Sequence, residues 1–96
     1  METNLKVWHN QWLIIHDNHY KISSITTISD IQCYPSGPSM YVGFHIVADG
    51  VKVNFSNYAP FIDTFWSRRP DNGLIQKHKD YLIQQRQKII DLVRSI

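Results

Sequence analysis

The chain has little that could cross-link it or carry it through a membrane. A single cysteine, Cys33, excludes an internal disulfide in these 96 residues, which favours a reducing compartment. The longest uninterrupted apolar run, Trp12–Ile15, is far too short for a membrane-spanning helix. The first residues, Met-Glu-Thr-Asn, have neither the basic region nor the apolar stretch of a secretory signal. The sequence therefore predicts a cytoplasmic protein with no membrane partner.

Catalytic signatures are also missing. No serine lies in Gly-x-Ser-x-Gly, the four glycines form no phosphate-cradling loop, and no element carries paired carboxylates. Cys33 lies in an expected strand, where we interpret it as a small buried apolar side chain rather than a nucleophile. We therefore predict that the protein is not an enzyme and needs no cofactor.

One polar turn has the residue types of a metal site. His16, Asp17 and His19 lie close in sequence, and His9 can approach them across the first hairpin. Imidazole and carboxylate are usual zinc ligands, but a site needs three or four of them in tetrahedral array. No Cys-x-x-Cys or His-Glu-x-x-His motif accompanies them, so we interpret the group as a plain turn.

What the chain does contain is enough apolar side chain for one core. Hydrophobic residues make up 43% and charged residues 19%, which is typical of one globular domain over residues 1–96. Residues 68–96 carry seven Lys or Arg side chains against three Asp, whereas residues 1–67 carry three Lys against five acidic side chains. Few alanines and many Ile, Asn and Lys residues suggest an AT-rich bacterial or phage genome.

The stretch Tyr41–Ser56 predicts a central β-hairpin about Asp49-Gly50. A two-residue Asp-Gly loop favours a type I′ turn, whose twist matches that of the flanking strands. Hydrophobic alternation gives the same register independently. The apolar face pairs Ala48 with Val51, Ile46 with Val53 and Phe44 with Phe55, and the other face pairs Val47 with Lys52, His45 with Asn54 and Gly43 with Ser56.

Short apolar and β-branched segments predict further strands before this hairpin. The irregular spacing of isoleucines indicates a bulge or short turn near Ser23-Ser24, and two prolines with a glycine indicate a loop over residues 35–39. The predicted strands are Leu5–Trp8, Trp12–His16, His19–Ile22 and Thr26–Tyr34.

After Ser56 the apolar period changes to that of a helix. Tyr58, Phe61, Ile62 and Phe65 fall at i, i+3, i+4 and i+7, which predicts a short helix over residues 57–66. Pro70 then breaks the chain, and Asp71 or Asn72 offers a new cap. A long amphipathic helix is expected over residues 72–96, because apolar residues recur seven apart at Ile75, Leu82, Ile89 and Ile96.

Together these segments predict an α+β domain. Residues 1–56 would form a strongly curved antiparallel sheet of five to six strands, packed by the short helix and the long C-terminal helix. This order of elements resembles the pleckstrin-homology-like fold. The stretch Trp12–Ile31 and the motif Ala-Asp-Gly-Val-Lys-Val at residues 48–53 also resemble small uncharacterised bacterial or phage proteins with such a sheet and a C-terminal helix. The resemblance implies a binding platform.

We expect a non-catalytic binding module, of the kind that a phage or bacterium uses to dock on and modulate a host protein. Trp66, Arg68 and Arg69 are the predicted anchors, because Trp and Arg dominate protein interfaces. The competing interpretation is that Trp66 caps the core and the arginines are merely solvated. Cations on the C-terminal helix would steer the partner: Lys77, Lys79, Arg86 and Lys88.

Two further kinds of partner are compatible with the sequence. A homodimer would form through the C-terminal helix or through an edge strand such as Leu5–Trp8 or Thr26–Tyr34. The alternative function is nucleic-acid binding through strand aromatics and the basic C-terminal helix. The strand aromatics concerned are Trp8, Trp12, Tyr20, Tyr34 and Tyr41.

Overall fold

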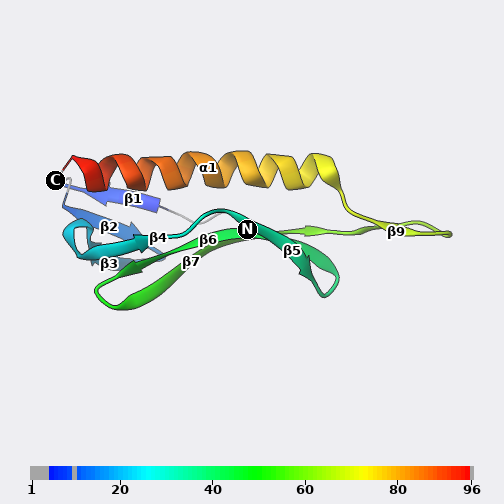
Figure 1. Cartoon of the computed structure of the whole chain (residues 1–96), viewed down its shortest axis with the longest axis horizontal. Helices are drawn as coiled ribbons and strands as arrows, with labels where there is room; N and C mark the ends of the chain where they lie inside the picture. Colours follow the sequence, from blue (N-terminus) through cyan, green and yellow to red (C-terminus); the bar gives the residue numbers. More distant parts are fainter. Residues whose placement is uncertain (1–4, 10, 96) are drawn as a thin grey trace.

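The computed structural model describes residues 5–9 and 11–95, which adopt an α+β fold of antiparallel sheets and a C-terminal helix (Figure 1). The helix runs along one side of the sheets, and the molecule is elongated, with extents of 52 × 21 × 21 Å. No helix in this described part is long and apolar enough to span a bilayer. The elements are β1 (Leu5–Trp8), β2 (Trp12–Ile15), β3 (Asn18–Lys21), η1 (Ile22–Ser24), β4 (Ile25–Ile28), β5 (Gln32–Ser36), β6 (Ser39–Ala48), β7 (Val51–Pro60), β8 (Ile62–Asp63), β9 (Arg68–Arg69) and α1 (Asn72–Arg94).

The hairpin β6–β7 is the centre of the fold, and its predicted register is confirmed. Phe44 lies opposite Phe55, and the other five predicted pairs also match. Asp49 and Gly50 both have positive φ, 53° and 75°, as a type I′ turn requires. The strands are longer than predicted, because pairing continues to Ser39 and Pro60.

The predicted strand Thr26–Tyr34 is wrong in one respect, because β4 and β5 are separate strands lying end to end along β6. At the break, Ser29 replaces a ladder bond with its side chain, whose Oγ accepts from the backbone N–H of His45 at 2.8 Å. Arg86 of α1 donates from Nε to the Ser29 carbonyl at 2.7 Å, which ties the helix to this break. The loop predicted over residues 35–39 is also shorter, since only Gly37 and Pro38 separate β5 from β6.

Strands β1, β2 and β3 form a separate antiparallel meander. The 3-10 turn η1 ends β3 and redirects the chain, and the Ile22 N–H donates to the Gln11 carbonyl at 2.9 Å. The prediction of a single, strongly curved sheet of five to six strands is therefore wrong. The described residues form antiparallel sheets of three, four and two strands instead.

The short helix predicted over residues 57–66 is absent. Strand β7 continues through Pro60, and β8 then pairs with β9 as a small hairpin. The helical spacing of apolar residues was misleading because a second, two-residue period continues from β7 into the start of the same stretch. The buried residues with this period are Val53, Phe55, Asn57 and Ala59. They belong to β7, which pairs with β6 along its whole length.

Helix α1 is confirmed from Asn72 to Arg94, while Ile96, its predicted last residue, lies outside the described part. The Asp71 carboxylate caps it by accepting from the Leu74 N–H at 3.2 Å. The predicted apolar seam joins the core, which also contains β6, β7, β2 and η1 side chains. The seam residues that are buried are Ile75, Leu82 and Ile89.

Gly43, in the middle of β6, should not tolerate a side chain. A β carbon there would lie 2.5 Å from Tyr41 Oη and 2.7 Å from the Phe55 carbonyl oxygen, which belongs to the sheet backbone and cannot easily retreat. We expect Gly43→Ala to lower the free energy of unfolding by about 1–3 kcal/mol in urea titrations. Gly73→Ala is the control: its β carbon would meet only Asp71 Oδ1, at 3.7 Å, and alanine favours a helix. Equal stability of the two variants would contradict this.

Candidate functional site

The hairpin β8–β9 extends from the sheet beyond the first turn of α1 (Figure 1). Ile62 pairs with Arg69 and Asp63 with Arg68, so residues 64–67 form the turn. Because the hairpin has these two residue pairs, its turn lies at one end of the long axis of the molecule (Figure 1). The segment therefore projects from the body of the domain.

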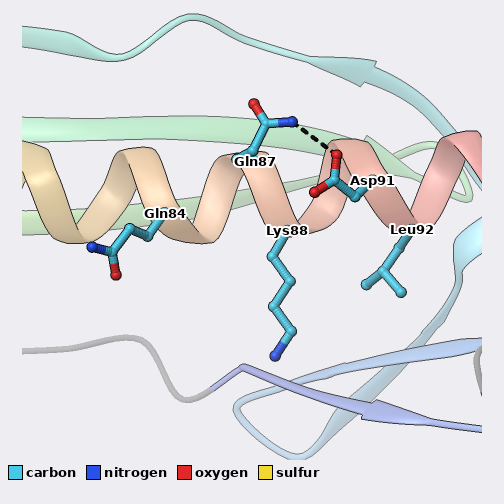
Figure 2. A pocket seen from close by; sticks show the side chains of 5 residues that line it. All are labelled: Gln84, Gln87, Lys88, Asp91 and Leu92. Carbon is cyan, nitrogen blue, oxygen red and sulfur yellow. Dashed lines mark hydrogen bonds between the residues drawn. The ribbon is translucent and has the colours of Figure 1, made fainter.

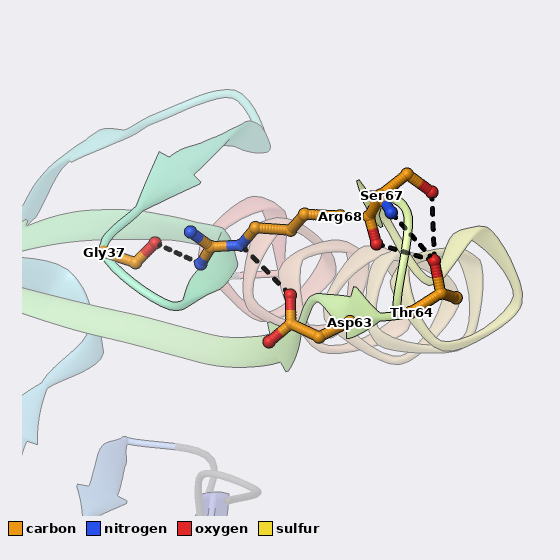
Figure 3. Close-up of polar contacts among 5 residues, drawn as sticks. All are labelled: Gly37, Asp63, Thr64, Ser67 and Arg68. Carbon is orange, nitrogen blue, oxygen red and sulfur yellow. Dashed lines mark hydrogen bonds and ion pairs between the residues drawn. The ribbon is translucent and has the colours of Figure 1, made fainter.

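The polar groups of this turn bond to one another (Figure 3). The Thr64 N–H donates to the Ser67 carbonyl at 2.8 Å. Figure 3 shows the Ser67 N–H donating to Thr64 Oγ1, at 3.0 Å. Thr64 Oγ1 in turn donates to the Ser67 carbonyl at 2.8 Å. The turn is thus closed by its own hydrogen bonds, with Phe65 and Trp66 at its two corners.

Phe65 and Trp66 form an exposed aromatic tip. Each is 89% exposed, and their rings meet edge to face with centroids 4.8 Å apart. Trp66 therefore does not cap the core. Large contiguous apolar patches on a protein surface often mark interaction sites, which makes this pair of rings a candidate.

Arg68 faces back toward the domain (Figure 3). Its Nη2 donates to the Gly37 carbonyl at 3.0 Å, its Nε lies 3.7 Å from Asp63 Oδ1, and its guanidinium lies 4.4 Å from the centroid of the Phe61 ring. Arg68 is thus a positioning residue that ties the hairpin to the β5–β6 turn, rather than the outward-reaching anchor expected from the sequence. Arg69 is exposed beside it.

The predicted steering cations do not form one cluster with this tip. Arg86 is held by the Ser29 carbonyl and lies 3.4 Å from Asp30 Oδ1. It also lies about 21 Å along the helix from Asn72, given a rise of 1.5 Å per residue. Lys77 and Lys88 are exposed and Lys79 is half-buried. Of the seven predicted site residues, the hairpin brings together Trp66, Arg68 and Arg69.

A shallow hollow of about 450 Å³ lies along the C-terminal half of α1 (Figure 2). Gln87 donates from Nε2 to Asp91 Oδ1 at 2.8 Å, while Lys88 and Leu92 extend toward the other side of the helix. Gln84 completes the lining. The hollow is an open groove with amide, ammonium and carboxylate groups at its rim.

The polar turn with metal-ligand residue types is a tight β-turn. His16 and Asp17 have positive φ, 49° and 65°, which the reversal between β2 and β3 requires. The His19 ring packs against Trp12 with centroids 6.5 Å apart. No group of three or more His, Cys, Asp or Glu side chains within residues 5–9 and 11–95 is arranged to hold a metal ion.

A row of tyrosines crosses the sheet on the face opposite the core. Tyr34 pairs with Tyr41, and Tyr41 pairs with Tyr58, with ring centroids 4.7 and 5.6 Å apart. The alternation of buried residues in β6 and β7 places the core and α1 on the other side. The strand aromatics considered for stacking are divided between two sheets, because Trp8, Trp12 and Tyr20 belong to the β1–β3 meander.

Two residues of the aromatic tip and the tyrosine row, Phe65 and Tyr58, were not predicted as surface residues from the sequence. Phe65 was assigned to a helix, although Thr64 and Ser67, which flank the aromatic pair, are residues that close turns with their hydroxyls. Tyr58 was assigned to the same helix, because the helical spacing of Tyr58, Phe61, Ile62 and Phe65 competes with the two-residue period that Asn57 and Ala59 continue past Ser56. The pairing of Tyr58 with Tyr41 became visible only with the full register of β6 and β7.

Because of the tyrosine row, the free energy of unfolding should depend on pH in the alkaline range. Burial raises the pKa of Tyr41 above its usual value, and the neighbouring Tyr34 and Tyr58 raise it further. The unfolded chain therefore releases this proton first, near pH 10, and the folded state is stabilised less as pH rises beyond that value. In urea titrations above about pH 10, Tyr41→Phe should lose stability less steeply than the native protein. Equal slopes would show that Tyr41 does not contribute.

A comparison of the chain with protein-family models, curated protein sequences and solved structures finds no match. The geometry of its own residues therefore carries the functional assignment. Within residues 5–9 and 11–95, the aromatic tip at Phe65 and Trp66 and the row through Tyr41 are exposed aromatic surfaces built from side chains that contact one another.

Proposed function

We propose that the chain is a non-catalytic docking module that binds another protein through the tip of the β8–β9 hairpin. Phe65 and Trp66 are the anchors. The observation that carries this proposal is the exposure of both rings, 89% each, at the end of a projecting segment. Large aromatic side chains are the commonest hot spots of protein interfaces, because they bury much area at little cost in side-chain entropy.

The hairpin is also preorganised for binding. The Thr64–Ser67 hydrogen bonds close the turn, and Arg68 ties its base to the Gly37 carbonyl. The Thr64 N–H and the Ser67 N–H and carbonyl already have partners, so a binding pocket need not supply them. A loop held in its bound conformation also loses less conformational entropy on association.

The distribution of charge supports a protein partner over a nucleic acid. A groove for single strands places its cations beside its stacking aromatics. Here the helix cations belong to α1, which packs on the core face, whereas Tyr34, Tyr41 and Tyr58 lie on the opposite face. The hairpin itself has two cations, Arg68 and Arg69, and Arg68 is already engaged by Asp63 and Gly37.

A phage or bacterial accessory protein that docks on a host protein is the form of the role that we favour. The homodimer stays a prediction. Because Ile75, Leu82 and Ile89 pack in the chain's own core, a dimer through α1 would have to use the outer side of the helix, where Ile83 is 51% exposed.

The proposal is tested by retention of a partner from an extract of the source organism. Immobilised native protein should retain a protein that the double variant Phe65→Ser/Trp66→Ser does not, and nuclease treatment should leave retention unchanged. Serine suits turn positions, so the hairpin backbone should be preserved.

The matched control for this experiment is Trp8→Ser. Trp8 is a 52% exposed tryptophan in β1, outside the hairpin, and its loss should not affect retention. Retention that survives loss of both tip rings, or that disappears with nuclease, would overturn the proposal.

A further inference from the structure

The tyrosine row is a second exposed surface, separate from the docking tip. Tyr34 and Tyr58 are 48% and 52% exposed, and Tyr41 lies between them. We infer that this row binds a proline-rich protein segment in the polyproline II conformation. This site goes beyond the proposed docking of the hairpin, because none of its residues belongs to β8, β9 or their turn.

The spacing of the row matches the repeat of such a segment. Tyr34 of β5 and Tyr58 of β7 flank β6, so they lie two strand spacings apart, or about 9.5 Å. One turn of a polyproline II helix has three residues and advances about 9.3 Å. A segment lying across the strands would therefore place residues i and i+3 over Tyr34 and Tyr58, the spacing of a Pro-x-x-Pro motif.

The shape of the row suits a convex ligand. A β carbon on Gly43 would lie 2.7 Å from Tyr41 Cζ, so the Tyr41 ring folds down over this glycine. The half-buried Tyr41 forms a floor between the two more exposed rings, and proline rings pack well on such aromatic-lined surfaces.

The charge of this face matches an uncharged ligand. Across the described strands β4 to β7, the outward-facing side chains include no carboxylate, and Lys52 is their one Lys or Arg. A phosphate backbone would need several cations beside the rings. A polyproline II segment needs none, and its carbonyls, which have no internal hydrogen bonds, can accept from the tyrosine hydroxyls.

Calorimetric titration with a ten-residue polyproline peptide tests the inference. The native protein should bind it, and should not bind a Gly-Ser peptide of equal length. Tyr34→Thr and Tyr58→Thr should each weaken binding about tenfold, equivalent to about 1.4 kcal/mol. Threonine retains a preference for strands, so the sheet should persist. Trp8→Ser and Trp66→Ser should bind like the native protein, which separates this site from the docking tip.

Two further probes complete the test. A peptide with Pro-x-x-Pro spacing should bind more tightly than one with Pro-x-x-x-Pro, and amide chemical shifts of the native protein should move at Tyr34, Tyr41 and Tyr58. This mapping decides the matter even if a threonine variant unfolds. Absence of polyproline binding, shifts confined to other segments, or preferential binding of a ten-residue oligothymidylate by the same row would overturn the inference.

Discussion

Replacing Leu82 with alanine is expected to lower the free energy of unfolding by about 3–5 kcal/mol. Leu82 is 1% exposed and lies midway along α1, between Ile75 and Ile89, where the helix packs on β6 and β7. Its removal leaves a cavity between the helix and the sheet. Small domains have about 5–15 kcal/mol of stability in total, so this variant should lose a large share of it.

The neighbouring residue provides a matched control. Ile83 is 51% exposed, and Ile83→Ala should change the free energy of unfolding by no more than about 0.5–1 kcal/mol. Urea titrations followed by circular dichroism measure both values. If the two variants lost equal stability, α1 would not pack through its Ile75, Leu82 and Ile89 side.

The second large effect concerns binding rather than stability. With the partner purified, Phe65→Ser/Trp66→Ser should weaken its binding about 100-fold or more, because loss of a hot-spot residue costs about 2–4 kcal/mol. The free energy of unfolding of the same double variant should lie within about 0.5 kcal/mol of the native value, since both rings are 89% exposed. Calorimetry of binding and urea titration give the two numbers.

The contrast between these two numbers identifies the role of the tip. A structural role for Phe65 or Trp66 would lower stability and binding together. Unchanged binding in the double variant would place the interface elsewhere on the domain. Strong weakening of binding without loss of stability is the result that we expect.

The central hairpin and α1 were predictable because several local signals agree in each. Asp49-Gly50 defines a turn, and alternation about it gives the register that pairs Phe44 with Phe55. In α1, the cap at Asp71 and the seven-residue spacing of Ile75, Leu82 and Ile89 point to the same helix. Where local signals agree in this way, tertiary contacts do not change the type of secondary structure that forms.

Residues 57–66 could not be assigned correctly, because their sequence supports two periods. Tyr58, Phe61, Ile62 and Phe65 have helical spacing, whereas Asn57 and Ala59 continue the two-residue period of β7. Pairing with β6 decides in favour of the strand, and pairing is a property of the fold.

The candidate site was predictable only in part, for the same reason. Trp66 and Arg69 are exposed in the predicted segment, but the turn that joins Trp66 to Phe65 depends on the β8–β9 pairing. The role of Arg68 depends on Gly37, which lies 31 positions away in sequence. No local pattern shows such a contact.

The most direct measurement is the accessibility of Trp66 to acrylamide in the variant Trp8→Phe/Trp12→Phe, where it is the single remaining tryptophan. In the free protein, we expect its fluorescence to be quenched nearly as readily as that of N-acetyltryptophanamide. Bound partner should then protect it from quenching. A Trp66 already shielded in the free protein, or one that is equally accessible in the complex, would contradict docking through the hairpin tip.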